Sequence, residues 1–123
     1  MMDQPSMLEL VKAVQSFIET RAMPELKGHT AFHARVAANA LGIVARELET
    51  GPKAAEMEKA QLARLLGHEG ELEELNRELC KHIREGKIDI ESSALRQHLE
   101  QTTLDKVMID QPNYSGLKIA KSR

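Results

Sequence analysis

The chain has 123 residues, enough for a single domain, and a formal net charge of -2 at pH 7. Its one cysteine cannot form an internal disulfide, and its three aromatic residues are too few for a base-stacking platform. The slightly acidic balance also disfavours a nucleic-acid partner, because binding to phosphates requires a basic face.

The composition predicts an all-α protein without a membrane span. Ala, Glu, Lys, Leu and Arg account for 61 of the 123 residues, a share typical of helical proteins. The most apolar stretch, residues 31–45, is interrupted by His33, Arg35 and Asn39, so it is not a transmembrane helix. The N-terminus lacks the basic and apolar segments of a signal peptide, and we therefore expect a cytoplasmic protein.

Five helices are predicted, and we expect them to form one compact bundle, a single domain over residues 1–112. Ser6 begins the first helix, since Glu9 three residues later completes a capping box, and Pro24 ends it. The Gly51-Pro52 pair predicts a break between the second and third helices. The expected helices span, in chain order, about 6–24, 28–49, 53–66, 71–85 and 92–111.

The second helix is nearly all apolar and is expected to be central. Its polar side chains Arg35, Asn39 and Arg46 share an arc about 40° wide. Small residues lie beside that arc, namely Ala34, Ala38, Gly42 and Ala45. A glycine inside a helix costs about 1 kcal/mol relative to alanine, so this side predicts a neighbouring helix packed unusually close.

The arc of Arg35, Asn39 and Arg46 is the leading candidate for a ligand site. Arginine presents a rigid fork of donors that suits a carboxylate or a phosphate, so one interpretation is an anion-binding pocket. The other interpretation is structural, with each arginine paired to a glutamate of a neighbouring helix, because a buried charge needs a partner. The abundance of glutamate favours the structural interpretation.

Lys106 and Tyr114 complete the set of candidate ligand-binding residues. Lys106 lies on an apolar arc of the last helix, where its amine could be reactive. The simpler interpretation is that Lys106 pairs with Asp110, four residues further on.

Other polar residues predict no catalytic or metal site. Cys80 and His82 are two apart on a helix and point in different directions, and Cys80 is expected to pack as a small apolar side chain. Asn76 is expected on the inner face of its helix, where it satisfies other polar groups. His29 and His33 are four apart, but two histidines do not form a metal site, so neither a metal nor another cofactor is expected.

The last predicted helix has apolar residues on two sides. Leu95 and Leu99 lie on one side, and Leu104 and Met108 project the other way. Such a helix is either enclosed by the bundle or covered by another subunit, and we therefore expect a homodimer. The segment that follows, residues 113–123, is expected to be a C-terminal tail.

Three stretches carry a family resemblance when they are taken together: residues 31–41, residues 74–79 and residues 103–114. The set resembles a family of short bacterial helical proteins that is labelled only as a domain of unknown function. The resemblance implies genes next to those of aminoglycoside-phosphotransferase-like kinases and acyl-CoA dehydrogenases. It supplies no reaction, and the association suggests an accessory role around coenzyme A-linked catabolism.

The leading hypothesis is a non-enzymatic, homo-oligomeric accessory or interaction protein whose partner is a neighbouring metabolic enzyme. The alternative is a small-molecule binding protein or enzyme, with an anionic ligand held by Arg35, Asn39 and Arg46.

Overall fold

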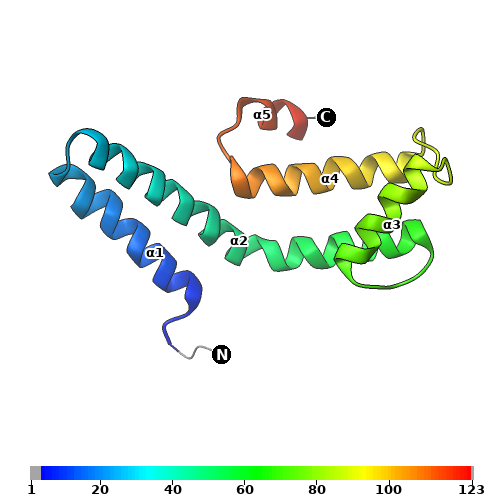
Figure 1. Ribbon diagram of the computed structural model, residues 1–123, viewed down its shortest axis with the longest axis horizontal. Helices are drawn as coiled ribbons and strands as arrows, with labels where there is room; N and C mark the ends of the chain where they lie inside the picture. Colours follow the sequence, from blue (N-terminus) through cyan, green and yellow to red (C-terminus); the bar gives the residue numbers. More distant parts are fainter. Residues whose placement is uncertain (1–3, 123) are drawn as a thin grey trace. The chain divides into compact units, whose positions relative to one another are not determined.

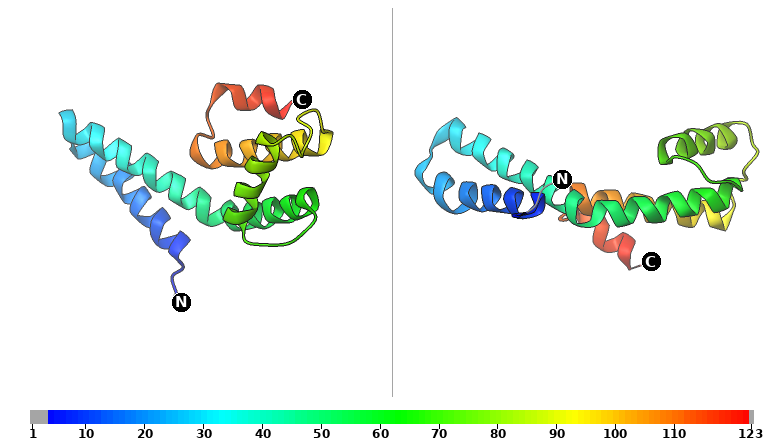
Figure 2. Two further views of the ribbon diagram at one scale, coloured as in Figure 1. Left: turned by 45° about the vertical axis from the view of Figure 1, so that its right-hand side comes forward. Right: turned by 90° about the horizontal axis from the view of Figure 1, so that it is seen from below.

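The computed structural model describes residues 4–122, which are helical, as predicted, and contain no strand. Five α-helices lie in this part of the chain; Figure 1 labels them and Figure 2 shows them from two further sides. Their bounds are α1 Met7–Phe17, α2 Gly28–Leu66, α3 Leu72–Arg84, α4 Ser93–Asp110 and α5 Ser115–Lys121. The all-α fold class is thus confirmed. No described helix is both long and apolar enough to cross a membrane.

The chain divides into two compact units, and the boundary falls inside α2, after Gly51. The Gly51-Pro52 pair, predicted as a break between two helices, lies within one continuous helix, so that prediction is wrong. Pro52 lacks the backbone N–H that would bond to the carbonyl of Leu48, and the helix continues through this position without that hydrogen bond. A single domain over residues 1–112 stays a prediction.

The first unit is a helical hairpin of α1 and the first part of α2, which lie side by side in Figures 1 and 2. The predicted capping box is present: Ser6 Oγ accepts from the backbone N–H of Glu9 at 3.1 Å, and the Glu9 carboxylate accepts from the Ser6 N–H at 3.2 Å. Helical turns continue from α1 through a π-helical and a 3-10 turn to Glu25. Pro24 does not end them, because a proline in the first turn of a 3-10 helix removes no hydrogen bond.

The small-residue side of α2 is buried in the hairpin, as predicted. Ala38 and Ala45 are 2% and 5% exposed, and Gly42 between them is also buried. The atoms nearest to the position of a Cβ on Gly42 are Nε2 of Gln15 and Nη1 of Arg46, each at 3.2 Å. The close approach at Gly42 therefore involves the ends of two side chains and not the backbones of two helices.

The other side of this part of α2 differs from the sequence expectation. A central helix would have its large apolar side chains covered, yet Phe32, Val36 and Val44 are all exposed. The reason is that the first unit consists of only two helices, so α1 can cover only one side of α2.

A leucine core holds the second unit together, and three helices supply it. Leu62 of α2, Leu75 and Leu79 of α3 and Leu95 of α4 are at most 3% exposed. Partly buried residues pack around this core, namely Leu65, Leu66, Leu72, Ile83 and Ile88. Full burial of a leucine is worth about 1.5–3 kcal/mol, so these contacts dominate the stability of the unit. Gly86, with a φ of 72°, ends α3 at the predicted position.

The segment 113–123, expected to be a tail, contains α5, and Leu117 of this helix is buried. α5 folds back beside α4 (Figure 1), and Ala120 of α5 faces Leu104 of α4 across a small cavity. Leu104, on the second apolar side of α4, is therefore directed at α5, whereas Met108 of the same side is 42% exposed. A helix this short is not stable alone, so its contacts with α4 account for it. The homodimer expected from the two apolar sides of α4 stays a prediction.

Candidate functional site

The three polar residues of the predicted arc lie along α2 in the first unit. Arg35 and Asn39 are exposed, whereas Arg46 is half-buried beside Gly42. Nη1 of Arg46 and Nε2 of Gln15 are both 3.2 Å from the Cβ position of Gly42, and the Gln15 amide donates to the Glu19 carboxylate at 3.1 Å. This polar side of the hairpin combines guanidinium groups with an amide, which are donors that suit an anion.

Lys106 and Tyr114, the other two candidates, belong to the second unit, and both are exposed. Lys106 lies on α4, and Tyr114 directly precedes α5. The ring of Tyr114 lies over Gly116, where a Cβ would come within 2.6 Å of Cε1. Gly116 thus leaves the room that the aromatic ring occupies.

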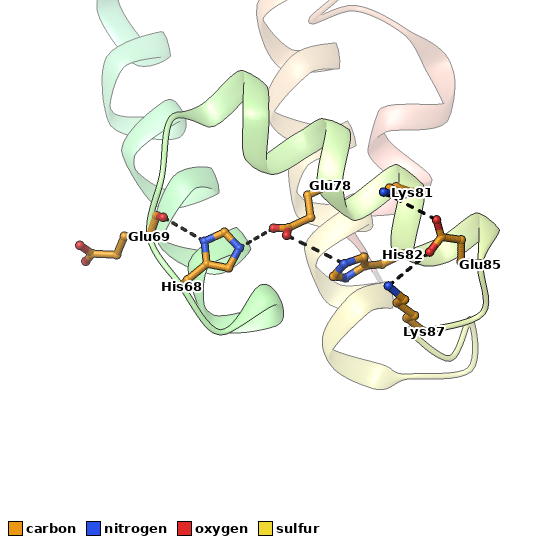
Figure 3. Close-up of polar contacts among 7 residues, drawn as sticks. All are labelled: His68, Glu69, Glu78, Lys81, His82, Glu85 and Lys87. Carbon is orange, nitrogen blue, oxygen red and sulfur yellow. Dashed lines mark hydrogen bonds and ion pairs between the residues drawn. The ribbon is translucent and has the colours of Figure 1, made fainter.

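A cluster that the sequence did not predict connects the end of α2 to α3, with Glu78 between two histidines (Figure 3). Oε2 of Glu78 is 2.6 Å from Nε2 of His68, and its Oε1 is 3.9 Å from Nε2 of His82. Nδ1 of His68 lies 3.0 Å from the backbone carbonyl oxygen of Glu69. The i,i+4 spacing of Glu78 and His82 signals one half of this cluster, but no periodic pattern signals His68, which lies in the turn after α2, ten residues before Glu78.

The two acceptors around His68 favour its protonated ring. The Glu69 carbonyl and the Glu78 carboxylate each accept a hydrogen bond, and only an imidazolium donates from both ring nitrogens. These bonds, that to the Glu69 carbonyl first, raise the pKa of His68 above its ordinary 6.5. His68 is exposed, so water screens the ion pair, and the cluster is a surface contact between the turn and α3.

Two further hydrogen bonds connect α2 to its neighbours in the second unit. Nδ1 of His98, a buried residue of α4, lies 2.9 Å from Oε1 of Gln61. Burial lowers the pKa of His98 below 6.5; the charge of Glu58 opposes this shift and that of Lys106 adds to it. The Asn76 amide donates to the Glu58 carboxylate at 3.2 Å, which confirms the predicted inward position of Asn76.

His98 also lines a cavity of about 230 Å³ between α2 and α4. The other lining residues are Gln61, Arg64, Leu65, Ala94 and Gln97. A neutral imidazole beside an arginine offers complementary polar groups to a small ligand. The volume nevertheless lies below the roughly 300–1,000 Å³ of ordinary ligand pockets, so we assign no ligand to this cavity.

The remaining candidates from the sequence lie on the surface. Cys80 is exposed, so the prediction that it packs as a small apolar side chain is wrong. It follows the buried Leu79 directly, and consecutive helical residues point about 100° apart, which turns the thiol outward. His29 and His33 are both exposed on α2. Among residues 4–122, no group of three or more His, Cys, Asp or Glu side chains is placed to hold a metal ion.

An uncovered apolar surface lies on the hairpin, and we call it the hairpin face. Its side chains are 41% to 60% exposed, and none of them carries a charge. They are Met7, Leu10, Val14 and Phe17 of α1 and Val44 of α2. Spacings of three and four residues put the α1 set on one side of its helix. The exposed Phe32 belongs to another side of α2, because it points about 20° from Asn39 and about 120° from Val44. No residue of α1 is buried, so α1 uses only part of its apolar surface against α2.

The two helices present the central part of this apolar surface on the same side of the hairpin. Gln15 lies opposite Gly42 and the helices run antiparallel, so Val14 comes level with Val44. Val14 directly precedes Gln15, and Val44 directly precedes the buried Ala45. Consecutive helical residues point about 100° apart, so each valine lies roughly a quarter turn from the side of its helix that faces the other helix. Because the helices are antiparallel, both valines lie on the same side of the hairpin, and Arg46 lies on the opposite side.

Comparison with known families assigns the class of protein. Residues 24–114 match the family described as Domain of unknown function (DUF6285). The chain belongs to this family, and the match includes α2, α3, α4 and the three stretches that carry the resemblance. No curated protein and no solved structure matches the chain.

Proposed function

We propose that this protein is a non-enzymatic accessory protein that binds another protein chain through the hairpin face. One observation carries the proposal: five apolar side chains on one side of two adjacent helices are uncovered. A contiguous apolar surface of a few hundred Å² is typical of a binding site. Its burial against a partner is favourable by about 25 cal/mol per Å², before the costs of association are subtracted.

A protein fits this surface better than a lipid bilayer does. Helices that lie in anionic membrane surfaces carry an excess of Lys and Arg on their polar side. Residues 4–51 instead carry equal numbers of basic and acidic side chains. These are Lys12, Arg21, Lys27, Arg35 and Arg46 against Glu9, Glu19, Glu25, Glu47 and Glu49. The hairpin therefore has no net positive charge to attract anionic lipid.

The family resemblance supplies the proposed enzyme partner, an aminoglycoside-phosphotransferase-like kinase or an acyl-CoA dehydrogenase. We place the function in the bacterial cytoplasm. An exposed free thiol such as that of Cys80 supports this compartment, because cytosolic reductants keep thiols reduced.

Differential capture from a native lysate tests the proposal. Tagged wild type is compared with Val14→Glu on the hairpin face and with Ser16→Glu, a matched control at an exposed position on the same helix. Circular dichroism first establishes that both variants are helical. We expect mass spectrometry to find a protein that wild type and Ser16→Glu retain and Val14→Glu loses. An identical set of proteins on all three baits would contradict the proposal.

A second candidate is an anion-binding protein that uses Arg35, Asn39 and Arg46. The position of these three polar side chains on one side of α2, with Arg35 and Asn39 exposed, favours it. A bound anion stabilises the folded protein, so inorganic phosphate should raise the melting temperature of wild type and not that of Arg35→Met. If phosphate shifts neither protein, or shifts both equally, this candidate is wrong.

A further inference from the structure

We infer that Thr50, Gly51 and Pro52 form a hinge in α2, at which the hairpin of the first unit changes its orientation relative to the second unit. The boundary between the two compact units falls after Gly51, inside one continuous helix. Two observations support a hinge there: α2 has little cover near the boundary, and its backbone is weakened at the boundary. The inference does not depend on which protein binds the hairpin face.

The buried cores of the two units do not extend along α2 to this boundary. Ala45 is the last buried side chain of α2 in the first unit, and Leu62 is the first one in the second unit. Of residues 46–61, all of which the structure describes, only Gly51 is buried, and the atoms nearest to its Cβ position belong to Glu47 of the same helix. Roughly four turns of helix therefore depend mainly on their own backbone hydrogen bonds.

Pro52 weakens these hydrogen bonds at the boundary itself. It has no N–H to donate to the Leu48 carbonyl, and its ring crowds that carbonyl in a straight helix. A proline also disfavours helical backbone angles at the preceding residue, partly through a clash with the Cβ of that residue. Gly51 has no Cβ, which lessens the clash, but a glycine holds helical angles less firmly than an alanine, by about 1 kcal/mol.

Thr50 weakens the same turn in a second way. Its hydroxyl donates to the Arg46 carbonyl at 2.9 Å, four residues back along the helix. Such a bond slightly destabilises a helix and often bends it. Sharp bends in helices are found mainly at prolines and where a side chain enters the backbone hydrogen-bond pattern. Thr50 and Pro52 therefore place two bending features on either side of a glycine, and the helix can bend here at little cost.

Distances between two spin labels on the full chain, measured by pulsed electron paramagnetic resonance, test the hinge. Ser16→Cys on α1 and the native Cys80 on α3 are both exposed and place one label in each unit. Cys80 with Glu100→Cys on α4 gives a control pair within the second unit. We expect a broad distribution of distances for the pair across the boundary and a narrow one for the control pair.

Replacing the hinge residues should remove the breadth. Gly51→Ala combined with Pro52→Ala restores the missing N–H, and the displaced Glu47 carboxylate can move into water because Glu47 is exposed. This double variant should narrow the distribution across the boundary to the width of the control pair. Lys53→Ala, at the exposed next position, should leave it broad. Circular dichroism establishes first that both variants are helical.

Two results would overturn the inference. One is a wild-type distribution across the boundary that is as narrow as that of the control pair, since α2 would then connect the units rigidly. The other is a broad distribution that the double variant leaves unchanged, since the motion would then lie elsewhere in the chain. Neither result bears on the proposed function, which depends on the hairpin face alone.

Discussion

The side-chain nitrogen of Gln15 on α1 lies 3.2 Å from the point where a Cβ would stand on Gly42 of α2. The amide and the Arg46 guanidinium beside it are the flexible ends of side chains, so they can move by a few tenths of an ångström. Gly42→Ala should therefore be neutral or stabilise the protein, by up to about 1 kcal/mol from helix propensity. Urea unfolding at a fixed protein concentration measures the change. A loss above about 1 kcal/mol would show that Gln15 and Arg46 are held rigidly.

A larger residue at the buried neighbour should behave differently. Ala38 is 2% exposed on the side of α2 that faces α1, so Ala38→Leu should overpack the hairpin and cost about 1–3 kcal/mol. Asn39→Leu adds a leucine at an exposed position on the polar side of α2 and serves as the control. The comparison is made in the same urea unfolding experiment. Equal stabilities of the two variants would contradict the packing of α2 on α1.

The contact between His68 and Glu78 predicts a titration that can be measured directly. The pKa of His68 is raised, so its contribution to stability is present below pH 6.5 and is lost as the pH rises through the folded-state pKa. Glu78→Gln removes the carboxylate, and NMR titration should show a lower pKa for His68 in this variant. The Glu69 carbonyl should keep part of the shift. An unchanged titration would mean that Glu78 does not contact His68 in solution.

The buried His98 should affect stability in the opposite direction. Its folded-state pKa is lowered, so the unfolded chain binds the proton more readily, and stability falls as the pH drops below about 6.5. His98→Gln removes this titration and keeps a group that can donate to Gln61. Thermal unfolding between pH 7.5 and 5 should therefore depend less on pH in the variant. If the melting temperatures of the two proteins depend on pH in the same way, protonation of His98 is not a cause of the destabilisation at low pH.

Local sequence signals predicted many element boundaries correctly. The capping box of Ser6 and Glu9 begins α1, Ser92 caps α4, and Gly86 follows α3. Each of these signals acts through residues close in sequence, so the end of the helix can be predicted without knowledge of the fold. The break expected at Gly51-Pro52 did not occur in the helix, because the proline removes one backbone hydrogen bond and leaves the other bonds of the helix in place. The unit boundary nevertheless falls at that pair.

Contacts between distant residues could not be predicted in this way. His98 and Gln61 are 37 residues apart, and no spacing rule connects them. The periodicity of Leu10, Val14 and Phe17 correctly indicated an amphipathic first helix. The periodicity does not show how much of this apolar side a neighbouring helix covers. The candidate arc of Arg35, Asn39 and Arg46 likewise follows from the helical angle, whereas the exposure of Arg35 depends on which helices surround α2.

The labelling rate of a thiol on the hairpin face tests the central claim most directly. In a Cys80→Ser background, which removes the exposed native thiol, Val14→Cys and Ser16→Cys are modified with a water-soluble maleimide with and without the captured protein. A partner chain seated on the face should slow the modification of Val14→Cys and leave that of Ser16→Cys unchanged. An equal effect of the captured protein on the two positions would contradict binding through the hairpin face.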